Sequence, residues 1–412
     1  MSSVPLSSSS NSEPDSEQPN VQGSTAAYAV SVLARPLDTE ALQEWALLHQ
    51  SQAELPFYLH PDWVRALDAC LFKQSLLAVS VYSSDAQAID STTKQPLMML
   101  LLHAPEKMQG KNRFSIGAPV HDHLTLGDVL IAEGQESTGI QSAIAAVLNH
   151  CDVSRLVFHN LPENSLLHAS IKNTDVVVGE KNCAPVWLCS RARDSAYFDL
   201  TDGSSVPPGK LKRNLKRLRG KLEKEGTVES RSYRGSDALQ AFEVFMDIEA
   251  SGWKGAEGTG SSIQADSQLS QFYQTLLQPE FEGLIPEIKH LCLNDEVIAV
   301  QYALRTGLTQ YILKISYNES FGYFSPGSLL LEDVIERAKQ AGVEKLSLVT
   351  SPAWAERWHP QILPVSRIVA HRSSLLAAGE RTVHGIRKRV KRASLIRFSI
   401  ADKVSSLSLI HI

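Results

Sequence analysis

The chain reads PEIKHLCLNDEVIAVQYALRTGLTQYILKISY over residues 286–317, and this stretch decides the fold class. Its alternating and β-branched residues predict three strands, at Pro286–Leu293, Val297–Arg305 and Thr309–Tyr317. Asn294-Asp295 and Thr306-Gly307-Leu308 separate the strands as short turns. The three strands are therefore expected to pair as antiparallel neighbours.

A helix and one more strand are predicted to follow. Apolar residues from Leu330 to Ala341 recur at helical spacing, Gly342 ends the helix, and Glu344–Thr350 is predicted as the next strand. Strands that pair locally and then lead into a helix and a further strand indicate an α/β (α+β) fold, with mixed, mostly antiparallel sheets flanked by helices.

The predicted helix opens directly from the turn Ser325-Pro326-Gly327-Ser328. The first N–H groups of a helix lack intrahelical acceptors and lie at the positive end of its dipole, so such a turn can bind an anion. We predict that Ser325, Gly327, Ser328 and Leu329 hold a phosphate-bearing cofactor, chiefly through the backbone N–H groups of the last three. The same residues also fit ordinary helix-start chemistry, with a proline in the first turn and a glycine for the bend.

Length and composition indicate a soluble globular protein of two domains plus tails. The chain has 412 residues, 43% of them hydrophobic and 21% charged. No apolar run approaches the roughly 20 residues of a membrane helix. Residues 1–25 are rich in serine and are predicted to be a disordered tail rather than a signal peptide. Five scattered cysteines without metal spacing favour reduced thiols in the cytoplasm.

The first half of the chain repeats the pattern of the second half in weaker form. Leu76–Tyr82 and Pro96–His103 are predicted to be paired strands, Ile140–Leu148 a helix and Arg155–His159 a strand. Ser190–Pro208 is the predicted join between the two halves. The pattern predicts an N-terminal domain at residues 26–200 and a C-terminal domain at residues 201–370.

Two basic segments stand out against a net charge of −5. Lys210–Gly226 is predicted to be a basic helix with a single stripe of leucines. Residues 371–412 are predicted to be a basic amphipathic segment, with an apolar stripe from Val383 to Ala393. This segment fits contact with an anionic inner-membrane surface as well as it fits a solvated helix packed on the domain. Nucleic-acid binding is disfavoured, because the basic segments lack interleaved aromatic residues.

Five segments, taken in order, form a recognisable set. They are Phe57-Tyr58-Leu59-His60-Pro61-Asp62-Trp63, Ser115-Ile116-Gly117-Ala118-Pro119-Val120-His121-Asp122-His123, Lys212–Gly226, Glu249–Gly255 with Gly258-Thr259, and Ser325-Pro326-Gly327 with its helix. In this order they resemble the GNAT-like acyltransferases typified by the cellulose-biosynthesis protein CelD, a group distantly similar to the Fem peptidyltransferases. The resemblance covers roughly residues 26–370.

The resemblance implies tandem GNAT-like domains and an acyltransferase that uses acyl-CoA (acetyl-CoA) as co-substrate. It also implies a small-molecule or glycan acceptor, an amine or hydroxyl of a cell-envelope or exopolysaccharide precursor. One position departs from the family pattern, because Trp354-Ala355 stands where Tyr-Lys is expected, although Trp358 keeps its place. The alternative function is therefore a non-catalytic scaffold or regulatory partner of a membrane polysaccharide synthase.

Direct acyl transfer from a thioester requires a base for the acceptor and an acid for the leaving thiolate. Glu249 is the predicted base, because it ends an apolar helix beside Trp253, and Tyr317 or Tyr323 is the predicted acid. Trp253 and Lys254 are predicted to bind the acceptor. Each of these residues also has an ordinary structural role open to it, as an exposed charge, a packed indole or a strand-end tyrosine.

A metal site is not predicted. His121-Asp122-His123 places two histidines on one face of an extended segment, but no third ligand is identified in the sequence. No Gly-x-Ser-x-Gly nucleophile motif is present either, so covalent catalysis is disfavoured.

Overall fold

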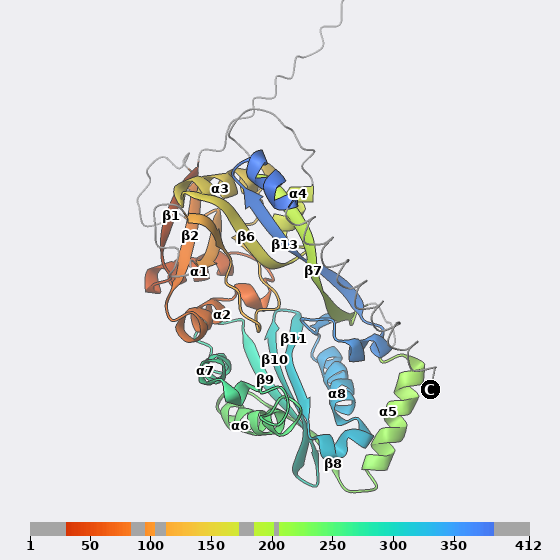
Figure 1. Ribbon diagram of the computed structural model, residues 1–412. Helices are drawn as coiled ribbons and strands as arrows, with labels where there is room; N and C mark the ends of the chain where they lie inside the picture. Colours follow the sequence, from red (N-terminus) through yellow and green to blue (C-terminus); the bar gives the residue numbers. More distant parts are fainter. Residues whose placement is uncertain (1–29, 84–94, 104–112, 173–184, 202–205, 383–412) are drawn as a thin grey trace, which may run out of the picture.

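Figure 1 shows the computed structural model of the protein. It describes residues 30–83, 95–103, 113–172, 185–201 and 206–382. The predicted tail at residues 1–25 and the apolar stripe Val383–Ala393 lie outside the described residues, so both stay predictions. Within the described part of the chain, no helix combines the length and apolarity needed to cross a bilayer.

Thirteen strands of the described residues form one continuous sheet. Along the sheet they lie in the order β1 (Val30–Pro36), β2 (Leu76–Ser83), β3 (Met98–His103), β4 (Arg113–Gly117), β6 (Val153–Pro162), β13 (Gln361–His371), β7 (Val186–Asp199), β12 (Lys345–Ser347), β11 (Thr309–Tyr317), β10 (Glu296–Thr306), β9 (Ile285–Leu293) and β8 (Val228–Tyr233). The short strand β5 (Leu130–Ile131) pairs with β3. Among the described pairs, β4–β6 and β11–β12 are parallel and the others are antiparallel. The predicted α/β fold with a mostly antiparallel sheet is confirmed.

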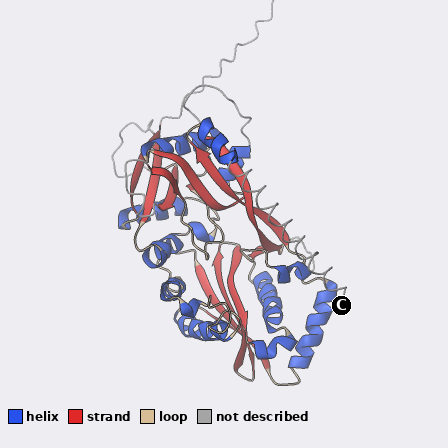
Figure 2. Cartoon of the chain, in the orientation of Figure 1, coloured by secondary structure: helices blue, strands red, loops and turns tan. Residues whose placement is uncertain are grey.

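Helices flank this sheet on both faces, as Figure 2 shows for the lower half of the molecule. The first half of the chain contains α1 (Thr39–Gln50), η1 (Phe57–Leu59), α2 (Pro61–Ala66), the π-helical turn η2 (Leu67–Leu71), α3 (Ser137–His150) and α4 (Leu166–Lys172). The second half contains α5 (Gly209–Leu222), α6 (Ser236–Ser251), η4 (Ile263–Ala265), α7 (Ser267–Thr275), η5 (Glu319–Phe324), α8 (Pro326–Gln340) and η6 (Ala353–Trp358). On β10, Val300 and Tyr302 pack with α6 and α7, whereas Ala299 packs with α8.

The two halves repeat one topology. In the first half, the antiparallel strands β2 and β3 lead through β4 and α3 to β6, which pairs in parallel with β4. In the second half, β9 and β10 lead through β11 and α8 to β12, which pairs in parallel with β11. A parallel pair needs a crossover connection, and a helix supplies it in both halves. The repeat of one α/β unit that the sequence pattern indicated is therefore present.

The boundary between the halves differs from the predicted one. Ser190–Pro208 was expected to join two domains, yet residues 186–199 form the long strand β7, which pairs with both β13 and β12. Strand β13 was assigned to the C-terminal domain, but it lies between β6 and β7 and completes the sheet of the first half (Figure 1). The chain thus returns to its N-terminal half, a long-range pairing that local sequence patterns do not encode.

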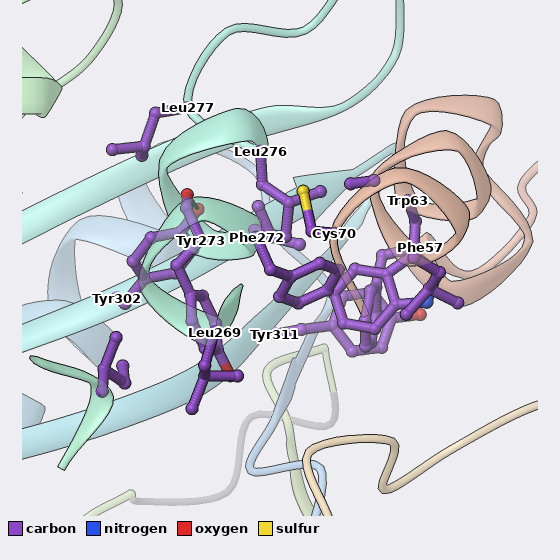
Figure 3. Packing of buried hydrophobic residues seen from close by; sticks show 14 of the residues in the cluster. Phe57, Trp63, Cys70, Leu269, Phe272, Tyr273, Leu276, Leu277, Tyr302 and Tyr311 are labelled. Carbon is purple, nitrogen blue, oxygen red and sulfur yellow. Dashed lines mark hydrogen bonds between the residues drawn. The ribbon is translucent and has the colours of Figure 1, made fainter. Parts of the chain in front are cut away.

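The halves also share a hydrophobic core, shown from close by in Figure 3. Trp63 of α2 packs edge-on against Phe272 of α7, with 5.0 Å between ring centroids. Phe57 packs in the same way against Tyr311 of β11, at 4.7 Å. Because aromatic side chains from both halves interlock here, we expect the two halves to unfold together.

A buried carboxylate fixes this contact. Asp62 is 1% exposed and accepts hydrogen bonds from the backbone N–H groups of Glu280 (3.1 Å) and Phe281 (3.2 Å). Arg65 pairs with the same carboxylate at 2.9 Å. His60 reaches the carbonyl of Glu282 at 3.0 Å. The segment Phe57–Trp63, which resembled a family motif, therefore anchors residues 280–282 of the second half.

Replacing Asp62 by alanine is expected to lower the free energy of unfolding by about 2–4 kcal/mol, because two backbone N–H groups lose their acceptor and Arg65 loses one of its two carboxylate partners. Asp62→Asn keeps one acceptor oxygen and is expected to cost less. Urea unfolding followed by tryptophan fluorescence checks both values. An Asp62→Ala protein as stable as the wild type would show that this carboxylate does not hold the halves together.

Candidate active site

Strand β11 separates from β12 after three residues. Thr309–Tyr311 pair with Lys345–Ser347, whereas Ile312 and Lys314–Tyr317 pair with β10 alone. The separation follows from β12, which was predicted to continue to Thr350 but ends at Ser347. Val349 adopts a left-handed conformation (φ 52°), which is strained for a β-branched residue and turns the chain away.

A β-bulge lies on β11 at this divergence. Tyr302 of β10 stands opposite Lys314 and Ala303 stands opposite Ile312, so Leu313 is an extra residue on β11. A bulge leaves its extra residue unpaired and disrupts the local ladder. The edge of β11 that faces away from β10 therefore presents backbone groups near Leu313 that β12 does not pair.

The first turn of α8 lies beside the end of β11. Ser325 precedes the helix in a left-handed conformation, and its carbonyl accepts from the N–H groups of Ser328 (2.9 Å) and Leu329 (3.2 Å). The N–H of Gly327 has no partner among the described residues. Leu329 is fully buried. Of the three N–H groups predicted to bind an anion, only that of Gly327 is available, so the predicted anion site rests on it.

Arg357 adds a cation to this turn. It belongs to η6, the next element after β12, and it donates to the Ser328 hydroxyl. Its side chain is exposed. Sequence reasoning missed this residue, although it follows the Trp354-Ala355 departure by two positions. Gly327 and Arg357 together are the residues best placed to hold an anionic cofactor.

The opposite face of β11 carries a lysine that the sequence reasoning also missed. Ile315 and Tyr317 lie toward Gly327, whereas Lys314 faces the other way, with its Nζ 5.8 Å from the centre of the Tyr273 ring. Burial, together with the nearby Lys254 ammonium, lowers the pKa of Lys314 to about 8, against the opposing effect of Glu249. A fraction of neutral amine is therefore present near neutral pH. The available signal was a single lysine within the apolar run from Tyr311 to Ile315.

Glu249 contacts Lys254, but its carboxylate is not accessible as a base. Its carboxylate is 1% exposed. One oxygen accepts from Lys254 Nζ at 2.7 Å and the other from the N–H of Ile263 at 2.8 Å. Both oxygens are thus occupied by the loop that follows α6. Glu249 is therefore better placed to fix Lys254 and close the loop than to take a proton from the acceptor, which was its predicted role.

The loop itself depends on its glycines. A Cβ on Gly255 would lie 1.8 Å from the Ala250 carbonyl, and one on Gly258 would lie 1.8 Å from the Trp253 carbonyl. Trp253 is 61% exposed, and its backbone N–H donates to Glu319 of η5 at 3.0 Å. The loop is therefore tied to the segment before α8, with Trp253 free to contact a ligand. Its predicted role with Lys254 in acceptor binding stays a prediction.

The two candidate acids differ in their surroundings. Tyr317 is 40% exposed, and its ring lies against Gly327, 3.6 Å from where a Cβ would stand. Tyr323 is 69% exposed, and the Lys221 ammonium of α5, which donates to its hydroxyl, lowers the pKa of Tyr323. Tyr317 is therefore the candidate acid that lies at the divergence of β11, whereas Tyr323 contacts α5.

The first half of the chain contributes His123. Its Nδ1 lies 3.1 Å from the Tyr273 hydroxyl. Burial lowers the pKa of His123 to about 3, with Lys314 and His121 acting in the same direction, so the ring is neutral. The rings of His121 and His123 are 5.6 Å apart. Within the described ranges no three His, Cys, Asp or Glu side chains gather as metal ligands.

The arrangement thus has two sides joined by the open edge of β11. One side offers an amide and a guanidinium to an anion, through Gly327 and Arg357. The other gathers Lys314, Tyr273 and His123 from both halves of the chain, next to Lys254. Such a site can hold an anionic carrier on one face of the sheet and present its reactive end to an amine on the other.

Comparisons with known proteins find solved structures that are similar to this chain. A search of curated proteins finds no match. Among solved structures, L-PGS from Bacillus licheniformis is 13% identical over 87% of this chain and 98% of that chain, with a TM-score of 0.48. FemX is 10% identical over 82% and 96%, with a TM-score of 0.46. A tandem GNAT protein from the clavulanic acid biosynthesis pathway is 10% identical over 84% and 99%, with a TM-score of 0.40.

The resemblance to CelD itself is not tested by these comparisons and stays a prediction. The broader resemblance to GNAT-like proteins is supported by a family model. The matched region runs from α5 to η6 and includes β11, β12 and α8. Residues 209–358 match this model, which is that of the acetyltransferase (GNAT) domain.

Proposed function

We propose that the protein transfers an acyl group from acyl-CoA to an amine or hydroxyl of a cell-envelope or exopolysaccharide precursor, by direct attack. The observation that carries the proposal is the departure of β11 from β12, with the Gly327 amide on one face and the Lys314 amine on the other. The GNAT match over residues 209–358 supports acyl transfer as the reaction class.

The donor would bind along the open edge of β11. The pyrophosphate would lie at the Gly327 N–H and the Arg357 guanidinium, at the positive end of the α8 dipole. The pantetheine arm would extend between β11 and β12, where the two strands no longer pair. A backbone N–H near the bulge at Leu313 would then donate to the thioester carbonyl as negative charge develops on its oxygen.

The acceptor would approach from the face that carries Tyr273 and Lys314. Its nitrogen or oxygen attacks the carbonyl carbon, the neutral Lys314 amine takes the proton, and the C–S bond breaks to release the CoA thiolate. Tyr317, which lies at the donor side, is the residue proposed to protonate that thiolate. Glu249 holds Lys254 in place beside the reacting groups.

The class of acceptor is supported by the sequence resemblance to CelD-type proteins. The composite site adds a physical argument, because His123 from the first half lies next to Tyr273 from the second. An acceptor bound there would contact both halves, as ligands at domain junctions commonly do.

Isothermal titration with CoA, acetyl-CoA and longer acyl-CoAs tests the donor. Binding of at least one of them at micromolar to millimolar concentration is expected. No heat with any of them would contradict the proposal. Mass spectrometry of a panel of acyl-CoAs, with cell-envelope extract as the acceptor pool, then identifies the acyl chain and the product.

A further inference from the structure

A cavity of about 390 Å³ lies apart from the candidate active site, between β8, β9 and β10 and the C-terminal half of α8. Arg337 of α8 lines it, ten residues after Gly327 and hence about 15 Å further along the helix. Ile285, Ala338 and Ala341 form an apolar wall. The volume lies within the range of pockets that hold small ligands.

Positive charge dominates the lining. Lys289 projects from β9 into the cavity with a side chain only 3% exposed, and its Nζ lies 3.1 Å from the Glu287 carboxylate. The same carboxylate pairs with Arg234 at 3.0 Å. Gln310 is also within reach of it, at 3.5 Å. One buried carboxylate is therefore shared between two cations, which leaves part of their charge uncompensated.

Two more arginines line the cavity, and in the described part of the chain neither pairs with an acid. Arg337 donates to the Ser232 hydroxyl at 3.1 Å and to the Ser230 carbonyl. Arg305 donates to the carbonyls of Gly307 and Ala341. Asp333 lies within electrostatic range of Lys289 and Arg337, but Arg219 holds its carboxylate at 2.6 Å. The lining thus carries four cations against the carboxylate of Glu287.

A buried amide extends the polar floor of this region. Gln301 of β10 stands opposite Lys289 in the sheet and is fully buried. Neither its amide nitrogen nor its amide oxygen has a partner among the described residues. A buried polar group without a partner is costly, and it signals a missing water, ion or ligand.

We propose that this cavity binds a small phosphomonoester, with the phosphate held by Lys289, Arg234 and Arg337 and the organic part against Ile285 and Ala338. A dianionic phosphate matches the excess of positive charge better than a single carboxylate does. Guanidinium groups bind phosphate oxygens in pairs, which fixes the head group. The site does not depend on acyl-CoA and would persist if the proposed transferase function were wrong.

Isothermal titration of the full chain with phenyl phosphate tests the site, and inorganic phosphate and benzoate serve as comparison probes. Phenyl phosphate is expected to bind once per chain and more tightly than benzoate. Arg337→Gln and Lys289→Met should each weaken binding by about tenfold or more, as expected for a lost charge-assisted hydrogen bond. Lys339→Gln, which removes the same charge from α8 outside the cavity, is the matched control and should bind like the wild type.

Gly327→Asp distinguishes binding in this cavity from binding at the first turn of α8. The substitution blocks that turn and should leave phenyl phosphate binding unchanged. Loss of binding in Gly327→Asp, with retention in Arg337→Gln and Lys289→Met, would place the phosphate at the helix start and overturn the proposal. Equal binding of phenyl phosphate and benzoate would also overturn the assignment to phosphomonoesters. Because Arg337 is exposed, its replacement keeps the test valid if Lys289→Met fails to fold.

Discussion

Replacing Lys314 by methionine is expected to lower the rate of acyl transfer by about 10²- to 10⁴-fold, the usual contribution of a positioned general base. Methionine keeps the length of the side chain and its contact with the Tyr273 ring, but it cannot accept a proton. The donor contacts of Gly327 and Arg357 lie on the other face of β11, so binding of acetyl-CoA should stay unchanged.

The pH dependence gives a second measurement for Lys314. Its pKa of about 8 in the folded protein means that the side chain is mostly protonated, and unable to accept a proton, below that pH. The rate constant kcat/KM should therefore rise about tenfold per pH unit up to about pH 8 and then level off. The same rise should be absent from the residual activity of Lys314→Met.

Two variants make this result specific. Lys345→Met removes another half-buried strand lysine, on β12, and should leave turnover unchanged. Glu249→Gln tests the base predicted from the sequence, and it is expected to cost less than Lys314→Met because both carboxylate oxygens are already occupied. A larger loss in Glu249→Gln than in Lys314→Met would return the role of base to Glu249.

Local patterns predicted the second half of the fold well because neighbouring residues decide it. The hairpin between β9 and β10 was expected at Asn294-Asp295, and both residues have positive φ (50° and 69°), as tight hairpin turns require. The helix after Ser325 was expected from its proline and its apolar spacing, and α8 begins at Pro326. Turn chemistry and helix starts are encoded within a few residues.

Contacts between distant segments could not be predicted in the same way. Strand β13 lies between β6 and β7, about 200 residues from one of its partners. His123 and Tyr273 come together only because the two halves pack on one another. From the sequence, His123 was considered only as a metal ligand and Lys314 was not considered. The surroundings of both residues are formed by segments that are distant in the sequence.

The position of β13 also decides how the C-terminal segment can be studied. A chain cut after Val369 would lose the end of β13, together with Glu380, which pairs with Arg155 at 2.7 Å and with His371. A scaffold role of residues 383–412 is therefore tested by a chain that ends at residue 382. This chain keeps the described fold and should keep acyl transfer if the protein is an enzyme.

Replacing Gly327 by aspartate is expected to weaken acetyl-CoA binding by about 30-fold or more. The new carboxylate would stand where the pyrophosphate is proposed to bind, and like charges about 4 Å apart near a protein surface repel by up to about 4 kcal/mol before screening. Isothermal titration of the purified variant measures the loss.

The same substitution should not lower the stability of the protein. Weaker acetyl-CoA binding could therefore not be explained by unfolding of the variant. Gly327 is not in the left-handed region, and the nearest atom to an added Cβ is Tyr317 Cδ1 at 3.6 Å, an ordinary contact. An aspartate in the first turn of α8 interacts favourably with the helix dipole, so Tm should stay constant or rise slightly. Gly327→Ala, which adds the Cβ without the charge, should bind acetyl-CoA nearly as well as the wild type. If Gly327→Asp binds acetyl-CoA as tightly as Gly327→Ala, the carrier does not lie at this helix start.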